Sequence, residues 1–152
     1  MGVLTDDMKR VVEEQQLGFV ATVSPDGSPN LSPKGTTAVW DDDHLIFADI
    51  CSPDTIANLR ANPSIEINVV DPLVRKGYRF KGVARVLGEG SDYEAGLDFY
   101  RQRGSASAKP HIVLVRVERA AELISPAYDS GQSEAAVASK WRAYWEALWS
   151  RR

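Results

Sequence analysis

The stretch GFVATVSPDGSPNLSPKG, residues 18–35, decides the fold class. Its first six residues form an apolar run typical of a buried strand. Residues 24–29 then combine two serines, two prolines, an aspartate and a glycine, which is the composition of a hairpin turn. A second strand is predicted over residues 30–39, so the chain begins its sheet as an antiparallel meander.

The remaining elements follow from capping residues and from the period of the apolar positions. A first helix is predicted from the Thr5 cap to Gln16, and a short helix begins with Ser52 as cap and Pro53 in the first helical position. Residues 77–87 alternate between apolar and basic side chains, as in a half-buried strand. Further strands are expected at residues 44–49, 64–71 and from 111 to at least 118, and further helices at residues 92–103 and 134–149.

About six strands with few peripheral helices predict a mainly β protein, built as a closed antiparallel barrel. We expect one domain over residues 1–152, with the barrel at about 17–124 and a C-terminal helix at about 133–149.

The composition limits the classes of protein to consider. Eighteen Lys and Arg against 21 Asp and Glu give a formal net charge of -3, and no basic block argues for a nucleic-acid partner. Cys51 is the single cysteine, which excludes an internal disulfide and fits a reducing compartment. The sequence has no apolar run of 18 residues. We therefore expect a cytoplasmic protein with no membrane partner.

The segment Ser32, Pro33, Lys34, Gly35 is a candidate cofactor site. The Lys34 cation can bond to a phosphate oxygen or to the polar edge of a ring system, and Gly35 lets a flat ligand approach the backbone. The alternative is a solvated lysine at a β-bulge.

Ser52, Thr55 and Asn58 surround the start of the short helix, whose free N–H groups attract anions. Thr55 and Asn58 are three residues apart and share a helix face. Capping is the alternative role, and Asp54 in the same turn would repel a phosphate if it pointed inward.

Arg79, Lys81 and Arg85 form a basic row on one face of the strand at residues 77–87. Like charges on one face repel each other, and a bound phosphate would remove that cost. Exposure to solvent is the alternative, especially for Arg85.

No catalytic or metal-ligating constellation is predicted. His44 and His111 are isolated in the sequence, and Cys51 has no partner histidine. Trp141, Trp145 and Trp149 recur every four residues and give the last helix a broad apolar stripe. Because that helix lies outside the predicted barrel, we expect its stripe to pack against a second subunit.

From Gly18 to Leu87 the chain resembles the pyridoxamine 5'-phosphate oxidase-like, FMN-binding split-barrel flavoproteins. The resemblance depends on five motifs in a fixed order: Pro25-Asp26-Gly27-x-Pro29, Ser32-Pro33-Lys34-Gly35, Phe47-Ala48-Asp49, Thr55-Ile56-x-Asn58-Leu59-Arg60-x-Asn62-Pro63 and Arg79-Phe80-Lys81-Gly82. It implies a six-stranded Greek-key split barrel and a homodimer with one FMN in each of two clefts between subunits. Ser32 to Gly35 match the strand beside the flavin, and Ser52 and Thr55 match the loop and helix start that hold the phosphate.

Two departures from the family pattern bear on function. Asp54-Thr55 stand where authentic pyridoxamine phosphate oxidases carry an Arg-Lys pair, and residues 125–131 lack the family's arginine- and histidine-bearing substrate segment. Oxidation of pyridoxamine phosphate is therefore not expected.

The sequence leaves three functions open. The first is an FMN-dependent oxidoreductase with a small-molecule substrate or electron donor, in which the cofactor carries the chemistry. The second is a non-enzymatic FMN carrier or electron-transfer module, and the third is a deazaflavin-dependent reductase. An open cavity lined by Tyr78, Tyr128 or Trp40 would favour turnover.

Overall fold

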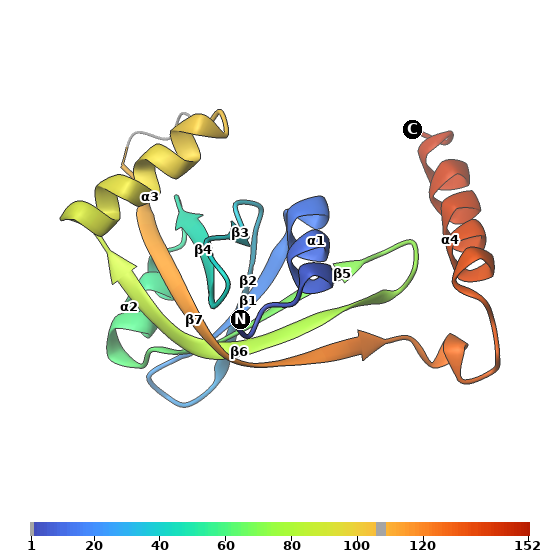
Figure 1. Cartoon of the computed structure of the whole chain (residues 1–152), viewed down its shortest axis with the longest axis horizontal. Coiled ribbons are helices and arrows are strands. Elements are labelled where there is room, and N and C mark those ends of the chain that lie inside the picture. The colour runs from blue at the N-terminus through green and yellow to red at the C-terminus, as the bar shows by residue number, and fades with distance from the viewer. Residues whose placement is uncertain (1, 106–108) are drawn as a thin grey trace.

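The computed structural model describes residues 2–105 and 109–152, which form a curled antiparallel sheet with four helices around it (Figure 1). The strands are β1 (Gly18–Val23), β2 (Pro29–Lys34), β3 (Ala38–Val39), β4 (His44–Asp49), β5 (Ser64–Asp71), β6 (Lys76–Leu87) and β7 (His111–Ile124). The helices are α1 (Asp6–Gln15), α2 (Pro53–Ala61), α3 (Ser91–Gln102) and α4 (Glu134–Trp149), with a 3-10 turn at Pro126–Tyr128.

The predicted fold class is confirmed: the protein is mainly β with peripheral helices, and its sheet is a split barrel. The strand order is β2-β1-β5-β6-β7-β4-β3. Within the described residues β2 and β3 are therefore the two edges of the sheet, so the barrel is split rather than closed. The described part of the chain has seven strands rather than six, because the expected second strand divides at Gly35. The Thr36 hydroxyl donates to the carbonyl of Ala48 at 2.8 Å and accepts from its N–H at 2.9 Å, which bends the chain between β2 and β3 toward β4.

Alternation along the strands separates an inner and an outer face. Val20, Ile67 and Phe80 point into the main core, where Val12 of α1 also packs. Strand β4 is buried on both faces, because Phe47 joins that core while Ile46 packs in a second cluster under α3. This two-sided burial explains the apolar run Leu45–Ala48 within β4.

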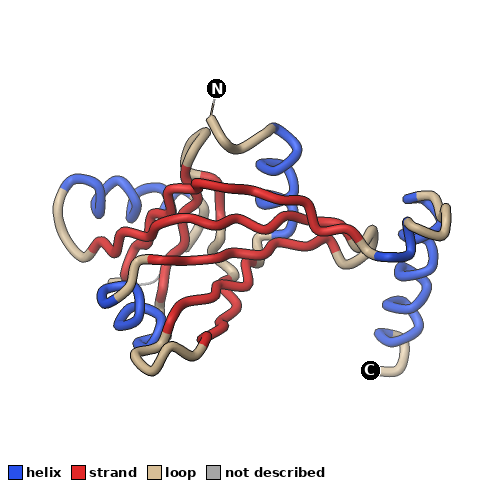
Figure 2. The backbone as a smooth tube through the Cα atoms, turned by 90° about the horizontal axis from the view of Figure 1, so that it is seen from below, coloured by secondary structure: helices blue, strands red, loops and turns tan. Residues whose placement is uncertain are grey.

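Strands β6 and β7 are the longest and extend beyond the barrel toward α4 (Figure 2). Their register shifts between Lys81 and Gly82, where Glu118 on β7 has no partner. A Cβ at Gly82 would lie 2.0 Å from the carbonyl oxygen of Arg116, so only glycine permits this close approach of the two backbones.

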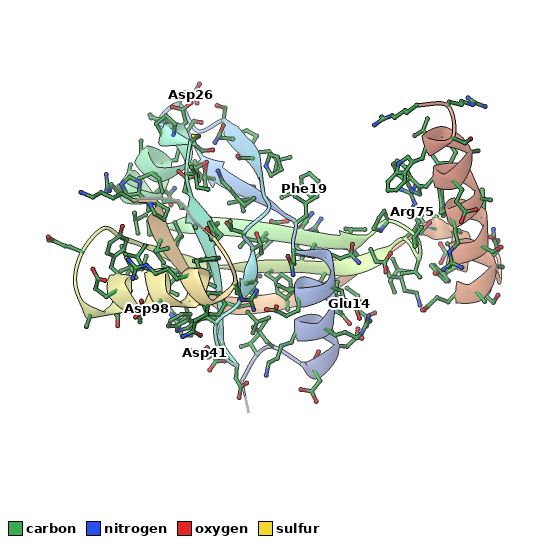
Figure 3. All side chains as sticks on the ribbon, turned by 90° about the horizontal axis from the view of Figure 1, so that it is seen from above. Glu14, Phe19, Asp26, Asp41, Arg75 and Asp98 are labelled. Atoms are coloured by element: carbon green, nitrogen blue, oxygen red, sulfur yellow. The ribbon has the colours of Figure 1, made fainter. Side chains whose placement is uncertain are left out.

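Helix α4 stands apart from the barrel as an arm (Figures 1 and 2). It is attached at the β5–β6 turn, where the Arg75 guanidinium lies 3.5 Å from the centre of the Trp141 ring and Lys76 pairs with Glu134 at 3.0 Å. Figure 3 shows Arg75 at the end of the hairpin beside this helix. No helix among the described residues is both long and apolar enough to cross a membrane.

Candidate functional site

The centre of the candidate site is a buried ion pair that the sequence analysis did not predict. Lys34, the last residue of β2, places its Nζ 2.6 Å from Oδ1 of Asp49 and 2.5 Å from Oγ of Ser52. The side chains of Lys34 and Asp49 are only 6% and 3% exposed. The N–H of Ser52 also donates to Oδ2 of Asp49 at 3.3 Å. Lys34 is therefore neither solvated nor a free cation. We call Lys34, Asp49 and Ser52 the lysine cluster.

A cleft of about 190 Å³ adjoins the lysine cluster. One wall is the segment from Pro33 to Thr36, and the other is the segment from Ala48 to Ser52. A Cβ added at Gly35 would meet no atom of the described residues within 4 Å, so among these residues nothing covers the backbone there. The structure thus brings together Pro33, Lys34, Gly35 and Ser52, four of the residues predicted to bind a cofactor.

Helix α2 begins directly after Ser52, the last residue that lines this cleft, and it has no side-chain cap; Thr55 is not itself a lining residue. Ser52 occupies the capping position but makes no capping hydrogen bond, because its hydroxyl instead accepts from Lys34. Thr55, in the first turn, is 1% exposed, and its hydroxyl has no hydrogen-bond partner in the described structure. Asp54 is exposed. Uncapped N–H groups and a buried unpaired hydroxyl are the donors that an anion requires.

Asn58, predicted to bind a cofactor or to cap the helix, makes a hydrogen bond within the fold. Its Nδ2 donates to the hydroxyl of Thr22 at 3.0 Å, and both residues are buried, so this bond ties α2 to β1. Asn30 also reaches Thr22, at 3.4 Å. Ser32 is half-buried on β2 and makes no side-chain hydrogen bond among those found in the described residues.

The structure does not bring Arg79 and Lys81 to the lysine cluster. Both are exposed on the outer face of β6, where Glu66 of β5 lies 2.7 Å from Arg79 and 3.5 Å from Lys81. Arg85 pairs with Asp92 at 2.8 Å. Carboxylates of the same chain therefore relieve the repulsion within the basic row, so this repulsion alone gives no reason to place a phosphate beside it.

The outer face of the sheet nevertheless links the end of β2, beside the lysine cluster, to the basic row on β6. One cross-strand row runs over β2, β1, β5 and β6: Pro33 pairs with Phe19, Phe19 with Asn68, and Asn68 with Arg79. Phe19 is 41% exposed. Leu31, in the next row on the same face, is 65% exposed. Figure 3 shows Phe19 projecting from β1. The Oδ1 of Asn68 is buried and has no partner among the described residues. We call this surface the outer sheet face.

The three aromatic residues considered for a substrate cavity lie in different places. Trp40 packs against the Phe99 ring, and the Tyr128 hydroxyl donates to the carbonyl of Val74 at 2.6 Å. Tyr78 lines a cleft of about 310 Å³ between α1 and the β6–β7 extension. Its hydrogen bond to the Asp7 carboxylate, together with burial, raises the pKa of Tyr78 to about 12. These three residues do not line a common pocket.

The histidines have closer carboxylate neighbours than the sequence suggested. His44 lies 2.8 Å from Asp41, and His111 is the cross-strand partner of Asp49. The described residues contain no group of three or more His, Cys, Asp or Glu side chains placed to hold a metal ion.

The sequence analysis did not predict the roles of Asp49 and Glu66 as counter-ions, although Asp49 stands in the Phe47-Ala48-Asp49 motif. The signal for Asp49 was a carboxylate that ends an otherwise apolar strand, immediately before a helix. The signal for Glu66 was its position on the half-buried face of β5, but its register against Lys81 could only come from the fold.

Comparisons with known proteins agree with this architecture. HupZ of Group A Streptococcus is 36% identical, with a TM-score of 0.72, over 80% of this chain and 95% of that chain. An FMN-binding protein from Syntrophomonas wolfei subsp. wolfei is 15% identical, with a TM-score of 0.63, over 76% of this chain and 82% of that chain. An F420 reductase is 21% identical, with a TM-score of 0.60, over 78% of this chain and 98% of that chain.

No significant match is found among the curated proteins. The sequence model described as pyridoxamine 5'-phosphate oxidase matches residues 4–125, which include every strand and leave α4 outside the match. The chain therefore belongs to the pyridoxamine 5'-phosphate oxidase family.

Proposed function

We propose that this protein binds FMN in the cleft beside the lysine cluster and is an FMN-dependent oxidoreductase of a small-molecule substrate. The observation that carries the proposal is the uncapped N-terminus of α2, where the Thr55 hydroxyl is buried without a partner. A phosphate would supply the missing acceptor. Pro33 and Gly35 on the opposite wall leave backbone accessible to a flat ring.

The chemistry would come from the cofactor. FMN supplies hydride or electron transfer when bound, so the protein needs to bind and orient it rather than provide a nucleophile. The lysine cluster would fix the end of β2 against the start of α2, so that both walls of the cleft keep their spacing.

A homodimer fits two surfaces of the chain. The outer sheet face exposes Phe19 and Leu31, and α4 exposes Trp149 of its tryptophan stripe and the neighbouring Tyr144. A two-fold interface buries such surfaces from both copies. Arg79 lies in the same cross-strand row as Phe19. In a dimer formed through this face, the basic row would therefore face the second copy and not the lysine cluster of its own chain.

The test compares the affinities of FMN and riboflavin, which differ only in the phosphate. Thr55→Val removes the unpaired hydroxyl and keeps the shape of the side chain. We expect this variant to weaken FMN by about fivefold, the value of roughly 1 kcal/mol for one hydrogen bond, and to leave riboflavin unchanged. Thr22→Val is the matched control, because the Thr22 hydroxyl already accepts from Asn58. Equal affinities of the wild-type protein for FMN and riboflavin would contradict the assignment of the phosphate site.

A carrier or electron-transfer module is the second candidate function. The observation in its favour is that Trp40, Tyr78 and Tyr128 do not line a common pocket beside the lysine cluster. Reduction of the bound flavin by NADH or NADPH, followed by transfer to a small acceptor, distinguishes the enzyme from the carrier. The absorption spectrum of the purified protein separates FMN from a deazaflavin. We expect pyridoxamine phosphate to be a poor substrate, because residues 125–131 carry no arginine or histidine.

A further inference from the structure

The lysine cluster contains one negative and one positive charge, both enclosed by protein. Lys34 is 6% exposed and Asp49 is 3% exposed, with Nζ and Oδ1 only 2.6 Å apart. Asp49 is also anchored from its other oxygen by the N–H of Ser52. The carboxylate is therefore held in place against the lysine.

This pairing changes what Lys34 can offer a phosphate. A lysine without a counter-ion would attract the phosphate strongly, because a charge-assisted hydrogen bond is about twice as strong as a neutral one. Here the Asp49 carboxylate cancels that charge, and it would itself repel an anion in the same cleft. A phosphate at this site must depend mainly on the uncharged donors of the α2 N-terminus and of Thr55.

We propose that Asp49 is a specificity-determining residue that weakens the site for phosphate by neutralising Lys34, so that the site favours FMN over riboflavin less than a free lysine would. The inference depends on the FMN site proposed above. Asp49 then has a role in binding as well as in stability. If its ion pair only stabilised the fold, replacing Asp49 would change the affinities for FMN and riboflavin equally.

Asp49→Asn tests this role, because it removes the charge and keeps an oxygen that can accept from Ser52. We expect it to tighten FMN binding by about tenfold or more, as Lys34 gains the phosphate as its partner, and to leave riboflavin unchanged. Adding Lys34→Met to this variant should abolish the gain. Asp49→Glu, which keeps the charge, should bind FMN as the wild type does.

The matched control is Asp129→Asn, which removes a charge of the same sign after the 3-10 turn at Pro126–Tyr128. Asp129 is exposed, does not line the cleft and pairs with no cation in the described structure, so we expect a change of less than about twofold. An equal gain in Asp129→Asn and Asp49→Asn would overturn the proposal, since the effect would then be a general one of net charge.

Two measurements keep the proposal testable if Asp49→Asn folds poorly. The first is the salt dependence of FMN affinity in the wild-type protein, which should change by less than about threefold between 50 mM and 500 mM salt because the lysine is already neutralised. A steep decline with salt would overturn the proposal. The second is thermal unfolding of the fraction of Asp49→Asn that does fold, whose midpoint FMN should raise by more than it raises that of the wild type.

The outcomes also separate this inference from the proposed function. A wild-type protein that binds neither flavin refutes the FMN site, and the role of Asp49 with it. A wild-type protein that binds FMN more tightly than riboflavin, combined with unchanged or weaker FMN binding in Asp49→Asn, refutes only the role of Asp49.

Discussion

Replacing Lys34 by methionine should destabilise the folded protein strongly, because it leaves the Asp49 carboxylate buried without its counter-ion. Methionine approximates the length and apolar stem of lysine, so little packing is lost. The remaining hydrogen bond to Asp49 is the one from Ser52 N–H, at 3.3 Å. Breaking a buried pair from one side costs about 3–5 kcal/mol. With a denaturant slope of about 2 kcal/mol per molar, the urea midpoint should fall by roughly 1.5–2.5 M.

The assay is urea unfolding followed by circular dichroism at one fixed protomer concentration, without flavin. A double-mutant cycle with Asp49→Asn isolates the pair, and the double variant should recover at least about 2 kcal/mol relative to the sum of the single variants. Arg101→Met is the matched control, because Arg101 and Asp98 form an exposed pair at 2.9 Å whose loss should cost less than about 0.5 kcal/mol. A cost for Lys34→Met as small as that of the control, or strict additivity in the cycle, would refute the reasoning.

Three further predictions concern other parts of the fold. Leu31→Asp should convert the proposed dimer into monomers in sedimentation experiments, whereas Val3→Asp should not; a wild type that is already monomeric would refute the interface. The free energy of unfolding should fall as pH rises from 10 to 12, because Tyr78 ionises in the unfolded chain before its folded pKa of about 12; Tyr78→Phe should show a smaller fall, and equal pH profiles would argue against it. Gly82→Ala should destabilise the protein severely, since its Cβ would meet backbone, whereas Gly88→Ala, with open space around it, should not; equal unfolding midpoints would contradict the close approach.

The sequence alone determined the local elements of this protein. The hairpin of β1 and β2 is encoded by an apolar run and a turn of serine, proline, aspartate and glycine, and α2 begins at Pro53 because proline fits the first helical position. Arg79 and Lys81 alternate with apolar neighbours in the sequence, which predicted that the two share one face of β6, as they do in the structure. These features depend on residues a few positions apart, so they could be predicted from spacing, capping and turn chemistry.

Only the tertiary structure decided which charged side chains pair with one another. Asp49 lies 15 residues from Lys34, and they meet only because β2 bends at Gly35 and brings its end against the end of β4. Glu66 reaches Lys81 through the register of β5 against β6. The position of a lysine in the sequence does not predict its counter-ion, because ion pairing depends on distance in space and on burial. Both are fixed only when the sheet has curled into its split barrel.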